Sequence, residues 1–273
     1  MGNYVSIISV RRTVGIDSSE ISDDDVTAII TEIESQVERY YNTVFTPKQR
    51  IDTLDGNGTY RIILDKNPLL AVRELRIDGD DEDPANLHVF RESGKIELNS
   101  DATNSTFLEG SHKVVVRYVY GFVEESSTST TTSAAEVAGT NVSVAVESIT
   151  GFADDAWVEI YGMDGNKEAA QINGTPSAGI IILDELVYSH EAGSTVVKLQ
   201  VSPVITKIMN ICCGIAMVAR IIGQSYTDIV GYTMTEFSVQ KGEPYTQWRE
   251  TASQLIKERD DLLGRIKIRS YIV

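Results

Sequence analysis

The sequence predicts an α+β fold in which helices pack with a small antiparallel sheet, plus an inserted all-β domain of barrel or sandwich type. Three observations predict it. Apolar residues recur with helical spacing near both ends of the chain. They alternate with strand spacing in two internal regions, about 50–121 and 142–200. Between these regions lies EESSTSTTTSAAEVAGT (124–140), which is low in complexity and poor in apolar residues.

The first predicted helix begins at Ser22. This serine and the three aspartates after it supply an N-cap and an acidic first turn, with Asp25 close to the capping-box position. Pro47 is expected to end the helix. One apolar face of an amphipathic helix of about 22 residues is formed by Val26, Ile29, Ile30, Ile33, Val37, Tyr40 and Val44.

Strand-like runs follow this helix. The turn signal DGNG (55–58) joins the first two of them, which predicts a hairpin. Asp-, Asn- and Gly-rich loops separate the others, so we expect one small antiparallel sheet. The runs are RIDTL (50–54), YRIIL (60–64), AVRELRID (71–78), LHVF (87–90), KIEL (95–98) and KVVVRYVYG (113–121).

The Ser/Thr-rich stretch at 124–140 predicts a flexible linker. Beyond it, the runs NVSVAV, AWVEIYG, EAAQI, GIIILD and TVVKLQ lie between Gly-rich turns within residues 141–200. About five short strands in roughly 60 residues are typical of a compact barrel or sandwich.

The pattern returns to helix at SPVITKIMN. Ser202 caps a helix of roughly 203–222, which is apolar almost all round and is therefore expected to be buried by the fold and by a neighbour. A loop at 223–243 leads to an amphipathic helix at 244–263, which Gly264 should end. Its inward residues are expected to be Trp248, Ala252, Leu255, Ile256, Leu262 and Leu263.

The last ten residues, GRIKIRSYIV (264–273), alternate apolar and basic side chains with the period of a strand. We therefore expect four parts. They are a core domain of 1–123 together with 201–264, a flexible linker at 124–140, an inserted β-domain at 141–200, and a C-terminal tail at 265–273.

Composition excludes several function classes. The formal net charge is −16, and such a chain lacks the clustered Lys and Arg that broad binding to nucleic-acid phosphates needs. An acidic surface does suit nucleic acid that slides past without sticking.

Cys212 and Cys213 are neighbours on a helix and point apart, so free thiols are expected in place of a disulfide. The chain begins without a signal-peptide pattern, and IMNICCGIAMVA (208–219) is too short to span a bilayer, which predicts a soluble intracellular protein.

Residues that carry chemistry are sparse. His88, His112 and His190 have no second His or Cys at ligand spacing, so no zinc site is expected and all three should be solvated in loops or at strand edges. The run DGDDEDP (78–84) lacks the glycine and the closing glutamate of an EF-hand, which favours a solvated acidic loop over the alternative of a Ca²⁺ site. No phosphate-binding loop, nucleophile elbow or metalloprotease motif occurs. We expect no enzyme, no catalytic residue, no cofactor and no metal.

Several segments, in order, resemble the head–tail connector proteins of tailed viruses, also called adaptors or head-completion proteins. DDDVTAIITEIESQVERYYNTVF resembles that family's opening helix, and TLDGNGTYRIILDKNPLLAVRELRIDG is similar to its hairpin, proline and strand. KVVVRYVYGF is similar to its last strand, SPVITKIMNICCGIAMVARIIG to its Pro-started helix, and IVGYTMTEFSV to its Gly-aromatic-Ser/Thr segment. The likeness covers roughly 20–123 and 201–273, whereas the module at about 124–200 departs from the family.

The resemblance implies a structural virion component of the neck. Such proteins form homo-oligomeric rings, usually of twelve subunits, between the portal protein and the tail or its completion (stopper) protein. DNA passes through the ring during genome packaging and ejection without sequence-specific binding. The expected partners are therefore the portal, the tail or stopper protein, other copies of the chain and, through the inserted domain, the major capsid protein, with no membrane. The expected location is the neck between capsid and tail, after assembly in the host cytoplasm.

Two hypotheses about site residues follow. The tail is expected to dock on the portal by strand addition or packing, although it could instead add an edge strand to its own sheet. Its residues are Arg265, Ile266, Lys267, Ile268, Arg269, Tyr271, Ile272 and Val273. The apolar helix at 203–222 is expected to contribute to the ring interface. Its residues there are Ile208, Ile211, Ile215, Val218 and Ile222.

A second function remains open, namely a binding protein whose β-domain recognises a glycan or a protein partner. Trp157, Tyr161 and Tyr188 are the aromatic side chains of that domain that could stack on sugars, and each suits a core position equally well.

Overall fold

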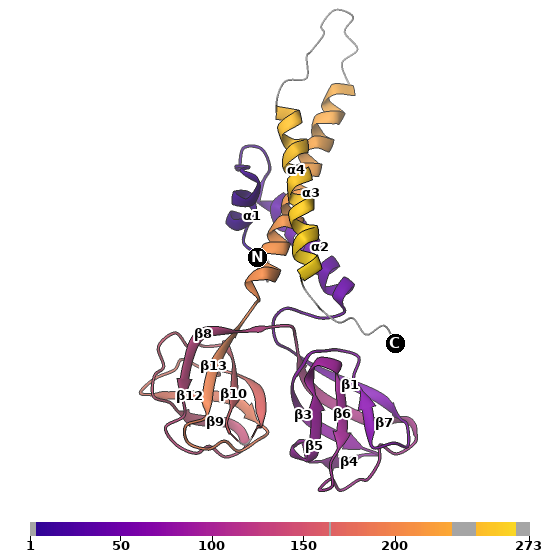
Figure 1. Ribbon diagram of the computed structural model, residues 1–273, viewed down its shortest axis with the longest axis vertical. Coiled ribbons are helices and arrows are strands. Elements are labelled where there is room, and N and C mark those ends of the chain that lie inside the picture. Colours follow the sequence, from indigo (N-terminus) through magenta and orange to yellow (C-terminus); the bar gives the residue numbers. More distant parts are fainter. Residues whose placement is uncertain (1–3, 164, 231–243, 266–273) are drawn as a thin grey trace, which may run out of the picture. The chain divides into compact units, whose positions relative to one another are not determined.

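The computed structural model describes residues 4–163, 165–230 and 244–265, with side chains for 4–163, 165–221 and 250–262. Its helices and antiparallel sheets confirm the α+β class. The chain forms two compact units (Figure 1). A helical unit contains Met1–Tyr41 and Ser202–Val273, and a β unit contains Asn42–Val201.

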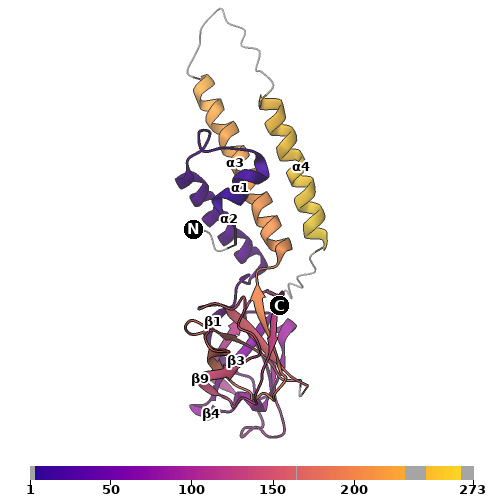
Figure 2. The same cartoon turned by 90° about the vertical axis from the view of Figure 1, so that its left-hand side faces the viewer.

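The helical unit is built from both ends of the chain. Its longest helix, α3, packs against the other three (Figures 1 and 2). An added Cβ at Gly214 would lie 2.7 Å from Val14 Cγ1, so the absence of a side chain there lets α1 approach α3 closely. The helices are α1 (Ile7–Val14), α2 (Asp23–Tyr41), α3 (Pro203–Val230) and α4 (Pro244–Arg265).

Local signals explain where the first helices begin. At α2, the Ser22 Oγ accepts from the Asp25 N–H at 3.1 Å, which confirms the predicted cap. Helix α1 was not indicated by the sequence patterns, and it begins with a capping box formed by Ser6 and Ser9. The predicted apolar face of α2 is wrong at Tyr40, which is 80% exposed.

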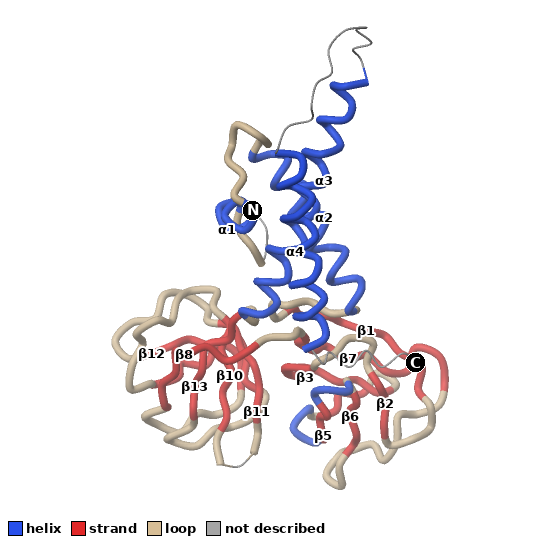
Figure 3. Tube along the Cα trace, turned by 45° about the horizontal axis from the view of Figure 1, so that its top comes forward, coloured by secondary structure: helices blue, strands red, loops and turns tan. Residues whose placement is uncertain are grey.

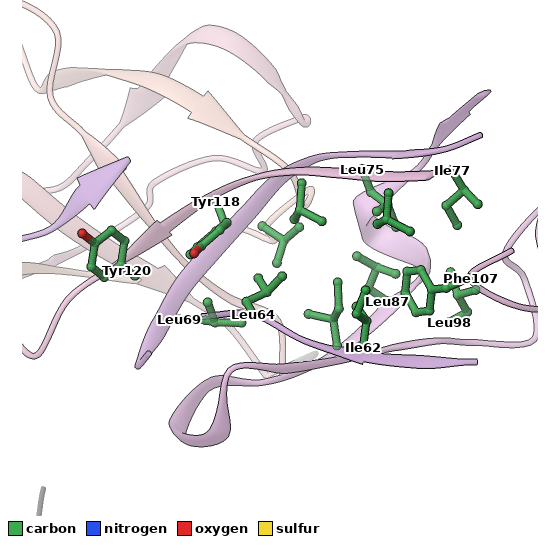
Figure 4. Close-up of a cluster of buried hydrophobic side chains, with 14 of the residues drawn as sticks. Ile62, Leu64, Leu69, Leu75, Ile77, Leu87, Leu98, Phe107, Tyr118 and Tyr120 are labelled. Atoms are coloured by element: carbon green, nitrogen blue, oxygen red, sulfur yellow. The ribbon is translucent and has the colours of Figure 1, made fainter. Parts of the chain in front are cut away.

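The β unit begins with a sandwich, the name used here for residues 42–123. One sheet has the order β1-β7-β3-β4 and the other β2-β6-β5, all antiparallel. Apolar side chains from both sheets, with Tyr118 and Phe107, fill the space between them (Figure 4). The strands are β1 (Lys48–Gly56), β2 (Arg61–Ile63), β3 (Leu69–Ile77), β4 (Asp80–Glu82), β5 (Leu87–Phe90), β6 (Lys95–Leu98) and β7 (Gly110–Tyr120).

The predicted hairpin around DGNG is wrong, because β1 and β2 belong to different sheets. The segment around Phe107 runs where a hairpin partner would lie. The Phe107 N–H donates to the Thr59 carbonyl at 2.7 Å, and the Phe107 carbonyl accepts from the Gly58 N–H at 2.8 Å. A Cβ on Gly56 would lie 1.6 Å from the Leu108 carbonyl oxygen, so the chain turns from one sheet to the other at a residue without a side chain.

Residues 124–201 form a closed barrel, called the barrel below (Figure 3). One sheet has the order β11-β10-β13-β8, and β12 pairs with β9. Two bridges, Thr132 with Val146 and Ile172 with Leu183, close the circle, and apolar side chains fill the interior. The strands are β8 (Glu124–Thr131), β9 (Gly139–Ala145), β10 (Trp157–Tyr161), β11 (Lys167–Gln171), β12 (Ile180–Leu186) and β13 (Thr195–Gln200).

The expected flexible linker at 124–140 is wrong, because β8 and the start of β9 occupy most of it. Threonine favours strands, and small polar side chains can face a barrel interior when their hydroxyl groups are bonded. The Thr130 Oγ1 accepts from the Ser148 N–H at 3.0 Å, and the Thr132 Oγ1 donates to the Glu191 carbonyl at 2.9 Å.

The division into units also differs from the expected core of 1–123 with 201–264. The helices of both chain ends do fold together, but the sandwich groups with the barrel. The reason is a shared buried surface on which Leu70, Ala71 and Val119 of the sandwich pack with Ala169 and Leu199 of the barrel.

Candidate functional site: the junction of sandwich and barrel

The residues singled out for portal docking lie almost wholly outside the described residues. Arg265 is the last residue of α4. The other seven, Ile266, Lys267, Ile268, Arg269, Tyr271, Ile272 and Val273, fall in the segment that the structure does not describe.

The residues singled out for the ring interface lie on α3. Ile208, Ile211 and Val218 are only 2%, 2% and 0% exposed, so the chain's own helices already cover them and leave no surface for a second copy. Ile215 is half-buried, and the side chain of Ile222 lies outside the described set. By length and composition Pro203–Ile221 would also suit a membrane span (mean hydropathy 1.7), a test that the core helix of a soluble protein passes equally.

The most developed polar site in the described residues is the junction of sandwich and barrel. Three arginines of the sandwich each pair with a glutamate of the barrel. Arg73 of β3 pairs with Glu168 of β11 at 3.4 Å, and Arg117 of β7 with Glu185 of β12 at 2.8 Å. Arg91, in a 3₁₀ turn (Arg91–Ser93), pairs with Glu159 of β10 at 2.5 Å. The sandwich thus supplies only the cations of these pairs, and the barrel only the carboxylates.

Arg73 is the most deeply buried of these cations, with a side chain that is 1% exposed. Besides Glu168, its guanidinium lies 3.6 Å from the Asp184 carboxylate. It donates to the backbone carbonyl of Ala169 at 2.5 Å and to that of Glu185. One side chain of the sandwich therefore satisfies carbonyls on two different barrel strands.

Glu168 is fully buried and collects donors from four sources. The backbone N–H groups of Val187 and Tyr188 donate to its two oxygens at 2.8 Å. The His190 Nε2 lies 3.1 Å from its Oε1, and Arg73 lies on its other side. Several charge-assisted bonds around one carboxylate make a rigid centre, since removing any donor leaves charge in a dry environment.

The expectation of a solvated His190 is therefore wrong, because its side chain is 0% exposed. Its Nδ1 has no hydrogen-bond partner among the described residues. His88 and His112 are exposed, as predicted.

Two partly exposed cations complete the junction. The bidentate hydrogen bonds from Arg117 to Glu185, at 2.8 and 3.0 Å, raise the pKa of that guanidinium above its ordinary value against the opposing effect of burial. Burial lowers the pKa of Lys167, but its bonds to Glu159 (2.7 Å) and Glu125 (3.0 Å) outweigh that effect and the net shift is upward. Both side chains are therefore fixed as cations.

Two cavities flank this junction, and Arg91 and Lys167 line both. The larger has a volume of about 520 Å³ and a largely charged wall that includes Glu92, Glu124 and Glu125. The smaller, of about 420 Å³, has an apolar floor with Phe90, His88 and Tyr188 at its wall. Burial raises the pKa of the Tyr188 phenol. Tyr161 and Trp157 are half-buried, and Trp157 packs on the shared apolar surface.

The acidic run at 78–84 is only partly the solvated loop that was expected. Its middle forms β4, and Glu82 is 3% exposed. The Glu82 carboxylate accepts from the backbone N–H groups of Thr103 and Asn104 at 2.9 and 3.0 Å. Desolvation raises the pKa of Glu82, but the hydrogen bonds lower it by a larger amount, so the net shift of the pKa is downward. This carboxylate therefore organises a loop of its own chain.

The ion pairs and hydrogen bonds of the junction hold the sandwich and the barrel together. No group of three or more His, Cys, Asp or Glu side chains suited to a metal ion occurs among the described residues. Sequence reasoning missed Arg73, Glu168 and His190, although a signal for one was present. Arg73 directly follows the apolar run LLAV (69–72) of β3, in the part of the strand where every residue is buried.

No family model and no curated protein matches the chain.

Proposed function

We propose that this chain is a head–tail connector of a tailed virus, a structural neck component without enzymatic activity. It forms a homo-oligomeric ring, of twelve copies by the resemblance, between the portal and the tail around the DNA channel. The observation that carries the proposal is the helical unit. Met1–Tyr41 and Ser202–Val273 fold together. Along the whole chain, the elements follow the order on which the resemblance rests, namely helix, sheet, Pro-started helix and last helix, with the barrel between the sheet and the Pro-started helix.

We also propose that the barrel is an inserted domain. A domain can be inserted without disturbing its host when its two ends lie side by side. The first and last barrel strands, β8 and β13, pair with each other, and Glu124 lies opposite Gln200 at the point of entry and exit. The barrel also has an apolar core of its own. In the ring it would contact the capsid shell, the tail or another copy.

The distribution of charge suits a ring around DNA. The β unit has 12 Lys and Arg against 25 Asp and Glu, whereas the helical unit has 12 against 15. Most of the net charge of −16 therefore belongs to the β unit. Like charge along a channel keeps DNA from adhering to its wall.

The second candidate is a binding protein that recognises a glycan or another protein through its β unit. The smaller cavity favours it, because an apolar floor with Tyr188 and Phe90 at the wall suits a ligand with an apolar face. The sandwich–barrel junction would then bind a ligand in addition to holding the two parts of the β unit together.

Co-expression with the portal protein of the same virus tests the proposal. We expect native mass spectrometry and electron microscopy to find a ring of this chain bound to the portal ring. A chain that ends at Gly264 should keep its circular dichroism spectrum and lose portal binding, if the tail docks there. A full-length protein that never joins the portal but binds members of a glycan array would overturn the connector proposal in favour of the second candidate.

A further inference from the structure

The strand edges of the β unit differ sharply in length. Every barrel strand has a neighbour on both sides, through a ladder or a bridge, so the barrel has no open edge in its described part. In the sandwich the edge strands β2, β4 and β5 have only three or four residues each. The remaining edge strand, β1, has nine. Long open edges are usually avoided because their unpaired backbone groups attract other strands.

The register shows which backbone groups of β1 point outward. The Asp78 N–H donates to the Lys113 carbonyl, and the Gly121 N–H to the Pro68 carbonyl, so odd-numbered residues of β7 bond toward β3. Successive residues of a strand point their backbone groups to opposite sides. Even-numbered residues of β7 therefore bond to β1, where Arg50 lies opposite Tyr118 and Asp52 opposite Val116. This leaves the N–H and C=O groups of the odd residues Gln49, Ile51 and Thr53 at the open edge.

The side chains along this edge are exposed and self-complementary. Gln49, Ile51 and Thr53 are all exposed, and Ile51, at 62%, is an apolar side chain in the middle of a polar strand. An antiparallel pairing of two β1 strands centred on Ile51 places this residue opposite its own copy and Gln49 opposite Thr53. On the other face, Asp52 is buried and already accepts from Arg50 and Tyr118 of its own chain, so the complementarity lies in the odd-numbered side chains. Apolar side chains directly across a strand pair are favourable.

We propose that β1 is a homotypic interface, through which two copies of this chain join their sandwich sheets edge to edge with Ile51 on the two-fold axis. The hydrogen-bonded pairs are Ile51 with Ile51 and Gln49 with Thr53, which use backbone groups that no strand among the described residues pairs with. The contact is isologous, because the same surface serves both partners. It does not rest on the connector proposal, and it involves no portal.

Charged substitutions at the centre of the pairing test it with the full-length chain. Ile51→Lys and Ile51→Glu should each place like charges opposite one another and weaken self-association at least about tenfold. An equimolar mixture of the two variants should restore it, because opposite charges then meet. Gln49→Lys is the matched control. It adds the same charge to the same exposed face, but it faces Thr53 of the second copy and should associate like the wild type.

Hydrogen exchange of the Gln49, Ile51 and Thr53 amides reports on the edge itself, and analytical ultracentrifugation reports the association. We expect protection that increases with protein concentration in the wild type and in Gln49→Lys, is absent in each Ile51 variant alone, and returns in the mixture. Protection that is independent of concentration would mean that the chain covers its own edge, and it would overturn the proposal. A wild type that stays monomeric with rapidly exchanging edge amides, or self-association insensitive to charge at residue 51, would overturn it as well.

Discussion

Replacing Arg73 with methionine should destabilise the β unit far more than the same replacement at Arg76. Both arginines lie on β3 and both form ion pairs. The Arg73 side chain is 1% exposed, whereas that of Arg76 is 51% exposed and pairs with Asp81 at the surface. Methionine keeps much of the apolar stem in either case, so the comparison isolates the buried guanidinium.

The magnitude follows from the groups that Arg73 leaves behind. Removing one partner of a buried ion pair typically costs about 3–5 kcal/mol, because the other charge stays uncompensated. Glu168 keeps its backbone donors and His190, which reduces that cost. The carbonyls of Ala169 and Glu185 lose a donor as well, and each orphaned group costs about 1–3 kcal/mol. We therefore expect a loss of roughly 3–5 kcal/mol for Arg73→Met, against at most about 1 kcal/mol for Arg76→Met.

Urea unfolding followed by tryptophan fluorescence measures this difference. The chain has two tryptophans, so a Trp248→Phe background leaves Trp157, in the barrel beside the junction, as the reporter of the β unit. Glu168→Gln and the double variant with Arg73→Met complete a cycle, in which we expect a coupling energy above about 1 kcal/mol. If Arg73→Met and Arg76→Met shift the midpoint equally, the buried pair does not hold the junction and the reasoning fails.

Three further predictions concern other parts of the chain. The pKa of Glu82 is lowered on folding, so the ionised carboxylate stabilises the protein above about pH 4.5 and this contribution is lost as the pH falls. The urea midpoint should therefore fall less steeply below about pH 5 in Glu82→Gln than in the wild type, and parallel curves would contradict this. Gly214→Ala should lower the free energy of unfolding by about 1–3 kcal/mol, because its Cβ would lie 2.7 Å from Val14. Thermal melts should show this loss, and Val14→Ala in the same chain should relieve part of it. An unchanged melting temperature would contradict the close approach of α1 and α3. Burial raises the pKa of the Cys213 thiol to about 12, so a thiol reagent at pH 8 should modify this thiol only when the helical unit opens. The reaction is followed in a Cys212→Ser background. Modification at the rate of a free thiol would refute the burial of Cys213.

Periodicity predicted which elements exist, and it failed where polar side chains form strands or face the interior. The apolar runs from RIDTL to TVVKLQ all became strands, because alternation records which side chains face a core. The strand β8, EESSTSTT, has no such alternation of apolar and polar residues. Its buried residue is Thr130, and Thr132 follows just beyond the strand; the hydroxyl group of each bonds to backbone. Hydropathy cannot distinguish this pattern from a solvated linker.

The hairpin around DGNG failed for a different reason. A turn signal establishes that the chain reverses, but not which strand it then pairs with. Here the segment around Phe107, much further along the chain, occupies the position beside Gly58 and Thr59. No pattern local to residues 55–58 contains that information.

The junction could not have been assembled from sequence, because it depends on which face of the sandwich the barrel covers. Arg73, Glu168 and His190 come from segments with no shared motif, and each has a plausible solvated role when considered alone. One signal was usable in retrospect. A charged residue that directly follows a strand segment apolar at successive positions, as Arg73 follows Leu69–Val72 in β3, needs a buried partner of opposite charge.

The sign of the charges at the junction constrains how the barrel can act. Without the barrel, the sandwich would expose Arg73 and Arg117 on the same sheet as Leu70 and Val119, a surface both cationic and apolar. A chain with the barrel deleted would therefore acquire a new sticky face, and its failure to assemble would say little about what the barrel contacts. Three arginine–glutamate pairs and the apolar patch also fix the barrel in one orientation on the sandwich. Any surface that the barrel presents to a partner therefore has a fixed orientation relative to the sandwich.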